Sequence, residues 1–221
     1  ALRDGYRENS AFNRSDGSLE VRYATALASF SPELFARLSV HQDTYGLPGP
    51  VSAADFVGSA SQRRDSNAPF DGGSTDDRTL TVGANLDFGT AGLLEFLLNR
   101  RDRDNPYIIG YTPLLSRADQ ASRIESNRQE MQLRYSLDFD ALGHTHSLDM
   151  GVHRQTADYL RSENGTDRLG SSTRRSGNIE GTGAYAETTL RGPGGLALNA
   201  GVRANRLASD YRDEKYDQVC V

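Results

Sequence analysis

The sequence predicts an all-β protein, an antiparallel up-and-down meander of about nine strands. The first observation behind this prediction is strict alternation of apolar and polar residues, clearest from Arg128 to Asp158. Successive side chains of a strand point to opposite faces, so a period of two gives each strand one apolar face and one polar face. The second observation is the spacing of turns and long polar segments along the chain.

The alternating segments follow one another from end to end of the sequence. The first is weakly extended, and a turn cluster at 13–18 separates it from clear alternation that begins at Leu19. We expect strands at 5–13, 19–27, 34–45, 80–88, 94–101, 130–139, 148–153, 182–190 and 196–208.

Tight turns and long connections alternate along this meander. Tight turns are expected near residues 30, 90, 142 and 193, and long polar segments begin near 47, 102 and 161. All tight turns then lie at one end of the sheet, as in outer-membrane barrels with short periplasmic turns and long extracellular loops. Ten tilted residues at about 3.3 Å each match the height of a lipid-facing band. The sequence therefore predicts part of a transmembrane outer-membrane β-barrel, incomplete at about nine strands.

Composition excludes several other classes of protein. The net charge of -5 gives no electrostatic footprint for nucleic acid. The mean hydropathy of -0.62 excludes helical membrane spans but suits barrel strands, which are half polar. The one cysteine, Cys220, cannot form an internal disulfide. No nucleophile elbow, zinc-protease signature, phosphate-binding loop or dinucleotide fingerprint is present, so we expect neither an enzyme nor a cofactor.

Four short motifs carry a resemblance to a known family. They are GYRENS at 5–10 with the LEVRYA strand after it, YGLPGP at 45–50, AYAE at 184–187 and LNAGVR at 198–203. Together with the strand pattern, they resemble the barrel domain of TonB-dependent outer-membrane receptors, in the branch that imports iron–siderophore complexes.

The resemblance implies a receptor and transporter in the bacterial outer membrane. Extracellular loops and an N-terminal plug would capture an iron–siderophore or a similar scarce nutrient, and the TonB complex would power its passage by pulling on the plug. The family's barrel has 22 strands, so residues 1–221 are expected to be a fragment of the barrel domain without the plug. The implied partners are the ligand, the TonB complex through that plug, and outer-membrane lipid.

Two alternatives remain open at this point. A passive outer-membrane porin would share the strand pattern and lack a plug. A soluble all-β binding module would pack its apolar faces against each other, but such folds mix loop lengths at both ends and have shorter strands.

Arginines and tyrosines near the second long segment are the candidate ligand contacts. These residue types suit anionic siderophores with catechol rings, through ion pairing and stacking. The candidates are Arg100, Arg101, Arg103, Tyr107 and Tyr111. The competing interpretation is that 100–104, with the sequence RRDRD, is a solvated strand end whose charges neutralise each other.

His144 and His146 are the only clustered imidazoles in the sequence. They fall in an expected tight turn with no third ligand nearby, so we predict no metal site there.

Overall fold

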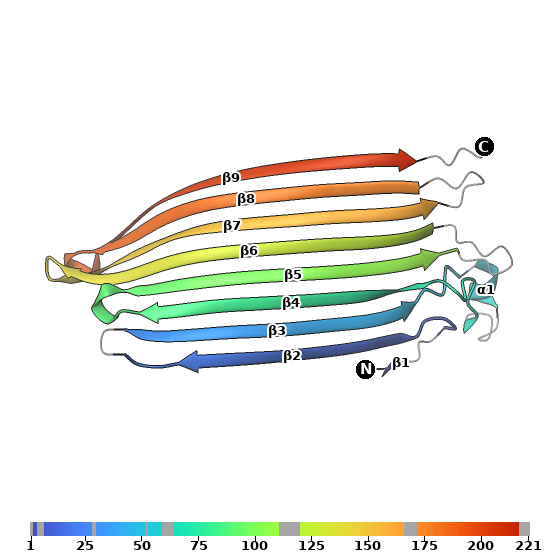
Figure 1. Cartoon of the computed structure of the whole chain (residues 1–221), viewed down its shortest axis with the longest axis horizontal. Coiled ribbons are helices and arrows are strands. Elements are labelled where there is room, and N and C mark those ends of the chain that lie inside the picture. The colour runs from blue at the N-terminus through green and yellow to red at the C-terminus, as the bar shows by residue number, and fades with distance from the viewer. Residues whose placement is uncertain are drawn as a thin grey trace.

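The described residues form a single sheet with the predicted meander topology. The computed structural model describes residues 2–3, 7–27, 30–51, 53–58, 64–110, 120–165 and 172–216. Their nine strands lie in sequence order, each antiparallel to the next, so the predicted all-β up-and-down fold is confirmed (Figure 1). The strands are β1 (Leu2–Arg3), β2 (Phe12–Ala24), β3 (Ser31–Gly46), β4 (Gly72–Asp87), β5 (Leu93–Ile109), β6 (Gln120–Ala141), β7 (His144–Gly165), β8 (Ser172–Arg191) and β9 (Ala197–Tyr216).

Helices in the described ranges are short. The α-helix α1 spans Ala53–Val57, and two 3₁₀ turns, η1 (Gly89–Ala91) and η3 (Pro193–Gly195), lie between strands. No helix among these residues has the length and apolarity needed to cross a membrane.

The two ends of the sheet differ as the turn spacing predicted. Figure 1 shows that β2, β4, β6 and β8 finish at one end of the sheet, and that β3, β5 and β7 finish at the other, beside α1. The turn between β6 and β7 contains only Leu142 and Gly143, both with positive φ, at 53° and 78°. Two such residues match the twist of a tight hairpin. The expected placement of all four tight turns at one end is therefore confirmed. The expected third long connection is wrong in length, because only residues 166–171 separate β7 from β8, as many as the residues 25–30 that separate β2 from β3.

The strands are longer than alternation alone indicated. Residues 102–127 were expected to be mostly loop, but β5 continues to Ile109 and β6 begins at Gln120. Likewise, residues 161–178 were expected to be a connection, but β7 continues to Gly165 and β8 begins at Ser172. We call the end of the sheet with the long connections the upper end. In these upper parts of the strands both faces are largely polar, so the sequence loses its period of two while backbone pairing continues.

The prediction for the first strand was wrong. Residues 7–11 are not in a strand, and the expected turn cluster at 13–18 lies inside β2. Its residues pair in register with β3, for example Asp16 with His41 and Ser18 with Ser39. The Asn, Ser, Asp and Gly residues suggested a turn, but the long partner strand β3 holds them in extended backbone.

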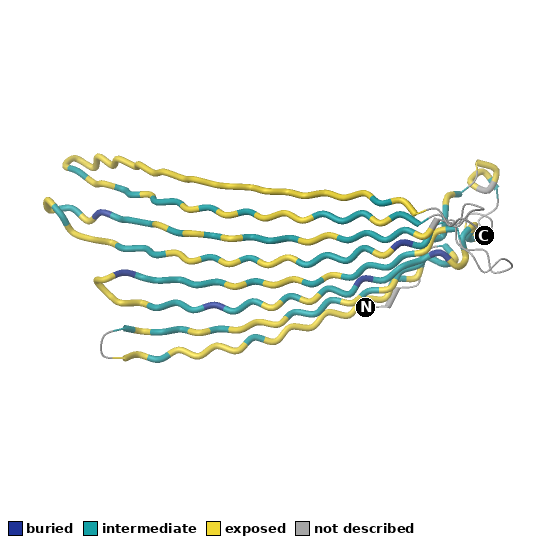
Figure 2. Tube along the Cα trace, turned by 45° about the horizontal axis from the view of Figure 1, so that its top comes forward, coloured by how far each residue is buried: buried dark blue, intermediate teal, exposed yellow. Residues whose placement is uncertain are grey.

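One face of the sheet carries a continuous apolar band, and we call it the banded face; the other is the polar face. Register places Leu38 between Leu19 and Leu80, as directly opposed pairs on one face. No large side chain among the described residues is fully buried, and Leu19 is 66% exposed. Figure 2 accordingly shows exposed and intermediate residues alternating along single-layer strands. The soluble module, in which apolar faces pack together, is not what these residues form.

The apolar band crosses the strands obliquely. On β2 and β4 its upper limit is the row containing Leu19 and Leu80, and on β3 it reaches Val40, one row higher. On β5 the residue beside Leu80 is already Arg100. On β6 the limit has moved down one row, to Met131, which lies beside Leu98 and Arg154. On β7 it has moved down again, to Val152. A band perpendicular to a barrel axis has this stagger when strands are tilted by about 35–45°.

Candidate functional site: the upper polar face

Cross-strand ion pairs cover the polar face. Arg37 contacts Glu20 across β2 and β3, and Arg134 contacts Asp149 across β6 and β7. Arg22 lies 2.6 Å from Glu33 and stacks over the Phe35 ring at 5.2 Å from its centroid. Most of these arginines are half-exposed, so solvent screens each pair and it contributes little to stability. Their joint effect is a hydrated, charged wall.

A hollow of about 880 Å³ lies on this face across β2 to β6. Its lining includes His41, Asp77, Arg101, Arg103 and Glu130. The hollow is above the apolar band, toward the end with the long connections. It therefore opens on the polar face between the apolar band and that end.

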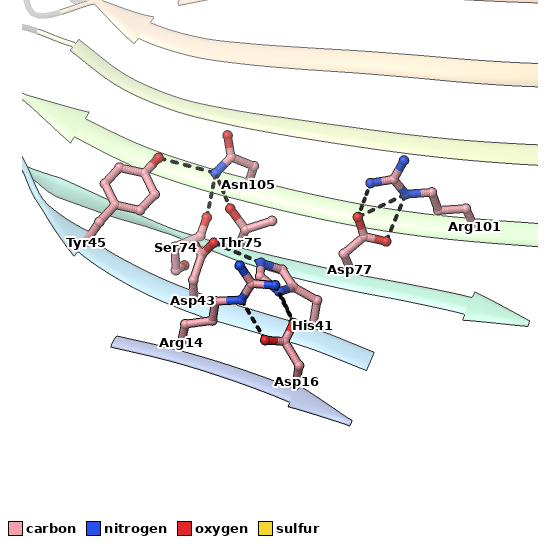
Figure 3. A network of polar contacts seen from close by, with 10 residues as sticks. All are labelled: Arg14, Asp16, His41, Asp43, Tyr45, Ser74, Thr75, Asp77, Arg101 and Asn105. Atoms are coloured by element: carbon pink, nitrogen blue, oxygen red, sulfur yellow. Dashed lines mark hydrogen bonds and ion pairs between the residues drawn. The ribbon is translucent and has the colours of Figure 1, made fainter. Parts of the chain in front are cut away.

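His41 joins two strands at the edge of the hollow, as Figure 3 shows. Its Nδ1 lies 2.7 Å from the Asp16 carboxylate and its Nε2 lies 2.9 Å from Asp43. These two hydrogen bonds, the Asp16 bond first, raise the pKa of His41 above its usual 6.5. Hydrogen bonds from Arg14 and then His41 lower the pKa of Asp16 to about 2. These groups lie above the apolar band, where the imidazole bridges two carboxylates.

Asn105 organises the neighbouring part of β3 to β5. Its amide nitrogen donates to the Ser74 carbonyl at 2.6 Å and to the Thr75 hydroxyl at 3.1 Å. It also lies 3.4 Å from the Tyr45 hydroxyl (Figure 3). This amide therefore fixes the Tyr45 ring at the top of the polar face. Sequence reasoning missed Asn105, because one asparagine in a polar segment gives no periodic signal.

A second polar cluster lies on β5 to β8, at the same level. The Tyr107 hydroxyl accepts hydrogen bonds from Arg161 at 2.8 Å and Gln120 at 3.3 Å. Glu163 accepts from Gln120 at 3.1 Å and pairs with both Arg161 and Arg175. Four strands thus place a tyrosine hydroxyl among two guanidinium groups and a carboxylate. The cluster resists separation of the strands above the apolar band.

The structure divides the five predicted ligand contacts. Arg101, Arg103 and Tyr107 lie on the polar face of β5, in alternating positions. Arg100 lies on the banded face, where its Nε is 2.9 Å from Asp102. Tyr111 falls outside the described residues.

Charge neutralisation separates the arginines further. The Arg101 Nε donates to both carboxylate oxygens of Asp77, each at 2.9 Å (Figure 3). Because Arg100 is likewise paired with Asp102, the competing interpretation of neutralised charges applies to Arg100 and Arg101. Within the described ranges, Arg103 has no acidic group at ion-pair distance, although it lines the hollow. Arg103 is therefore the candidate with a cationic group available to an anionic ligand.

The first long connection is held against the segment before β2. The Arg7 guanidinium donates to the carbonyls of Gly49, Pro48 and Asp65, the last two at 3.3 and 2.8 Å. The Asn9 amide donates to the carbonyls of Ala68 and Asp71, each at 2.6 Å. We call Arg7 and Asn9 the loop clamp. The clamp gives a physical role to GYRENS and YGLPGP, which carried the family resemblance.

Asp71 connects the same loop to the next. Its Oδ2 accepts a hydrogen bond from the Gly110 amide at 2.8 Å, and Asp71 is only 5% exposed. The ends of the first two long connections are thereby tied together.

His146, at the β6–β7 turn, has a structural role. The His146 Nε2 lies 2.9 Å from the Ala141 carbonyl, and the Arg191 amide donates to its Nδ1 at 3.0 Å. The ring also lies 5.3 Å from the Phe139 ring. Across the described part of the chain, no three His, Cys, Asp or Glu side chains are grouped to hold a metal ion.

Solved structures with a similar fold are outer-membrane receptors. P. aeruginosa FpvA, bound to heterologous pyoverdines, matches with a TM-score of 0.68 and 11% identity, over 99% of this chain and 33% of that chain. The FpvAI–pyocin S2 complex also matches with a TM-score of 0.68 and 11% identity, over 99% and 34%. The unliganded ferric citrate transporter FecA matches with a TM-score of 0.60 and 14% identity, over 93% and 34%. No protein-family model and no curated protein matches the sequence.

These likenesses concern the fold. The chain spans about a third of the length of the matching receptor chains. The predicted antiparallel meander, and its resemblance in fold to the barrels of TonB-dependent receptors, are confirmed.

Proposed function

We propose that this chain is part of the barrel of a TonB-dependent receptor in the bacterial outer membrane. The protein would take up an iron–siderophore or a similar scarce nutrient complex, with no covalent chemistry. In this proposal residues 1–221 belong to the barrel domain, and a plug supplied by the rest of the protein contacts the TonB complex. The banded face meets lipid and the polar face lines the lumen.

The observation that carries the proposal is the combination of two faces in one layer. The sheet has no second layer among its described residues, an oblique apolar band on one face and paired charges on the other. That arrangement needs lipid on one side and a hydrated space on the other. Its likeness to receptor barrels over 99% of the chain favours this receptor class.

Ligand contact is proposed for the upper polar face. Arg103 provides the cationic group, and Tyr107 an aromatic ring that Arg161 and Gln120 position. Arg101 contributes to the same wall while paired with Asp77. Tyr111, in the segment that joins β5 to β6, lies outside the described residues and stays a candidate. Arg100 lies on the banded face and is left out of this site.

Uptake by cells under iron limitation tests the proposal. A strain expressing the intact protein should accumulate a labelled ferric siderophore only with TonB and an energised inner membrane. Equal uptake after loss of TonB, or after a protonophore, would contradict the receptor and support a passive porin.

The ligand contact has its own variant. Arg103→Ala should weaken siderophore binding about tenfold, because a charge-assisted hydrogen bond contributes about 1.5–3 kcal/mol. Arg212→Ala is the matched control, since this exposed arginine lies on the opposite face. Equal binding by both variants would remove Arg103 from the site.

A further inference from the structure

A second hollow, of about 630 Å³, lies on the banded face of β5 to β9. Two neighbouring rows of residues line it. The lower row runs from Phe96 through Leu133 and Val152 to Ala184 and Ala204. Bulky side chains on β5 to β7 thus give way to methyl groups on β8 and β9. This decrease in size leaves an apolar groove, which we call the alanine groove.

The upper row ends the groove with cationic groups. Arg154 and Arg206 flank Thr182, directly paired with it on either side, and all three are exposed. Strands are spaced by about 4.8 Å, so the two arginine Cα atoms lie about 10 Å apart. Two flexible guanidinium groups at this separation can reach one oxyanion placed over the threonine hydroxyl. Arginine suits phosphate because its donors form a planar fork.

The charges around this row favour an anion. Arg154 lies 2.7 Å from Glu180, in an exposed pair with little net stability. Arg206 has no acidic group within ion-pair distance among the residues that the structure describes. The site therefore has one neutralised arginine, one unneutralised arginine and a hydroxyl group.

The position of the two arginines relative to the apolar band indicates the type of ligand. On β7 to β9 the arginines are one row above the last apolar row, toward the end with the long connections. A molecule with an acyl chain in the alanine groove would place its headgroup at the arginines. Such a molecule is an amphiphile with a phosphate at the boundary between chain and headgroup.

We propose that the alanine groove and the Arg154–Thr182–Arg206 row bind a phosphorylated lipid of the outer leaflet, of the lipid A type. One acyl chain lies over Ala184 and Ala204, and a phosphate lies between the two arginines. The proposal rests on the proposed outer-membrane location, which places the long connections outside the cell. It adds a lipid site on the outside of the barrel, separate from the ligand-facing hollow on the polar face.

Native mass spectrometry of the intact, detergent-purified protein tests this site, with bisphosphorylated lipid A as the probe. The wild type should bind lipid A saturably, and the Arg154→Ala/Arg206→Ala variant should bind about tenfold more weakly or worse. Ala184→Phe, which fills the groove while keeping the charges, should also weaken binding. Arg123→Ala is the matched control: this exposed arginine is on the same face, pairs with Asp104 at 2.8 Å and lies outside the groove.

Three results would overturn the proposal. They are equal binding by the double variant and the Arg123→Ala control, no effect of Ala184→Phe, and equal affinity for phosphatidylglycerol and lipid A. Heat-modifiable gel mobility shows that each variant is folded. Siderophore uptake is measured on the same proteins. If uptake depends on TonB but the variants bind lipid A as the wild type does, the lipid site is rejected and the proposed function stands.

Discussion

The lower and upper halves of the same strands differ in what specifies them. In the lower half, apolar residues alternate with polar ones, and register aligns them into a band, as with Leu38 between Leu19 and Leu80. In the upper half both faces are polar, and strands are joined by specific hydrogen bonds such as those of His41 and Asn105. The lower half is specified by the different environments of its two faces. The upper half is specified by pairing between side chains of neighbouring strands.

The largest expected effect is that of a charge in the lower half. Leu133→Arg places a guanidinium on the banded face and should destabilise the intact barrel in lipid vesicles by about 2 kcal/mol. This is the lower end of the cost of about 2–4 kcal/mol for an arginine at the bilayer midplane. Gln132→Arg is its neighbour on the polar face and should change the free energy of unfolding much less. Denaturant titration measures both, and equal losses would mean that the two faces do not meet different media.

In the upper half the largest effect is expected at the loop clamp. Arg7→Ala removes hydrogen bonds to three carbonyls, so the loop should open more easily by about 1–3 kcal/mol. Hydrogen exchange at the Leu47 and Asn67 amides, which bond to the Asp71 and Pro48 carbonyls, reports this opening. Arg14→Ala, which removes an arginine bonded to Asp16 on β2, should leave those amides protected. Unchanged exchange in Arg7→Ala would contradict the clamp.

A smaller effect is expected at the tight-turn end. Leu142 has a φ of 53° and is 94% exposed, so its side chain gains little packing in an unfavourable backbone conformation. Leu142→Asn should stabilise the barrel by about 0.5–1 kcal/mol, because Asn-Gly suits this type of hairpin turn. Leu196→Asn is the control, since Leu196 is exposed in another turn with a φ of -63°. A gain in both variants would indicate a general effect of polarity.

The smallest change is a shift in one titration. The pKa of His41 is raised, so its contacts stabilise the fold fully below pH 6.5 and lose that contribution as pH rises through the raised pKa. The pKa of Asp16 is lowered to about 2, so its contribution is present above pH 3.8 and is lost as pH falls through about 2. Asp16→Asn should lower the pKa of His41, as NMR titration of the ring would show. An unshifted titration would mean that Asp16 does not hold the imidazole.

The same contrast explains what the sequence could predict. Alternation located the lower parts of β4 to β9 and the turn and loop ends, because two unlike environments on the two faces of one sheet, lipid and lumen in the proposed barrel, impose a period of two. It could not locate the upper parts of β5 to β8, where stretches such as 102–105 and 125–129 are polar on both faces. Turn-forming residues at 13–18 were misleading because propensity is local, whereas pairing with β3 is not.

The candidate site was predicted in part for a related reason. Residue type pointed to Arg101, Arg103 and Tyr107, and strand parity places these three on one face. The same parity separates Arg100 from them, although it is adjacent in sequence. The partners that position the site, Asn105, Arg161 and Glu163, lie on other strands or carry no pattern, so register was needed to find them.

The most direct test is the environment of successive residues of β6 in the intact protein, reconstituted in lipid. Spin labels are attached one at a time at cysteines substituted for residues 130–139, with Cys220→Ser as the background. Odd positions, from Met131 to Phe139, should be accessible to oxygen dissolved in the bilayer, and even positions, from Glu130 to Asp138, to a water-soluble nickel complex. An accessibility without a period of two, or with the two sets exchanged, would contradict a lipid-facing band and a hydrated polar face.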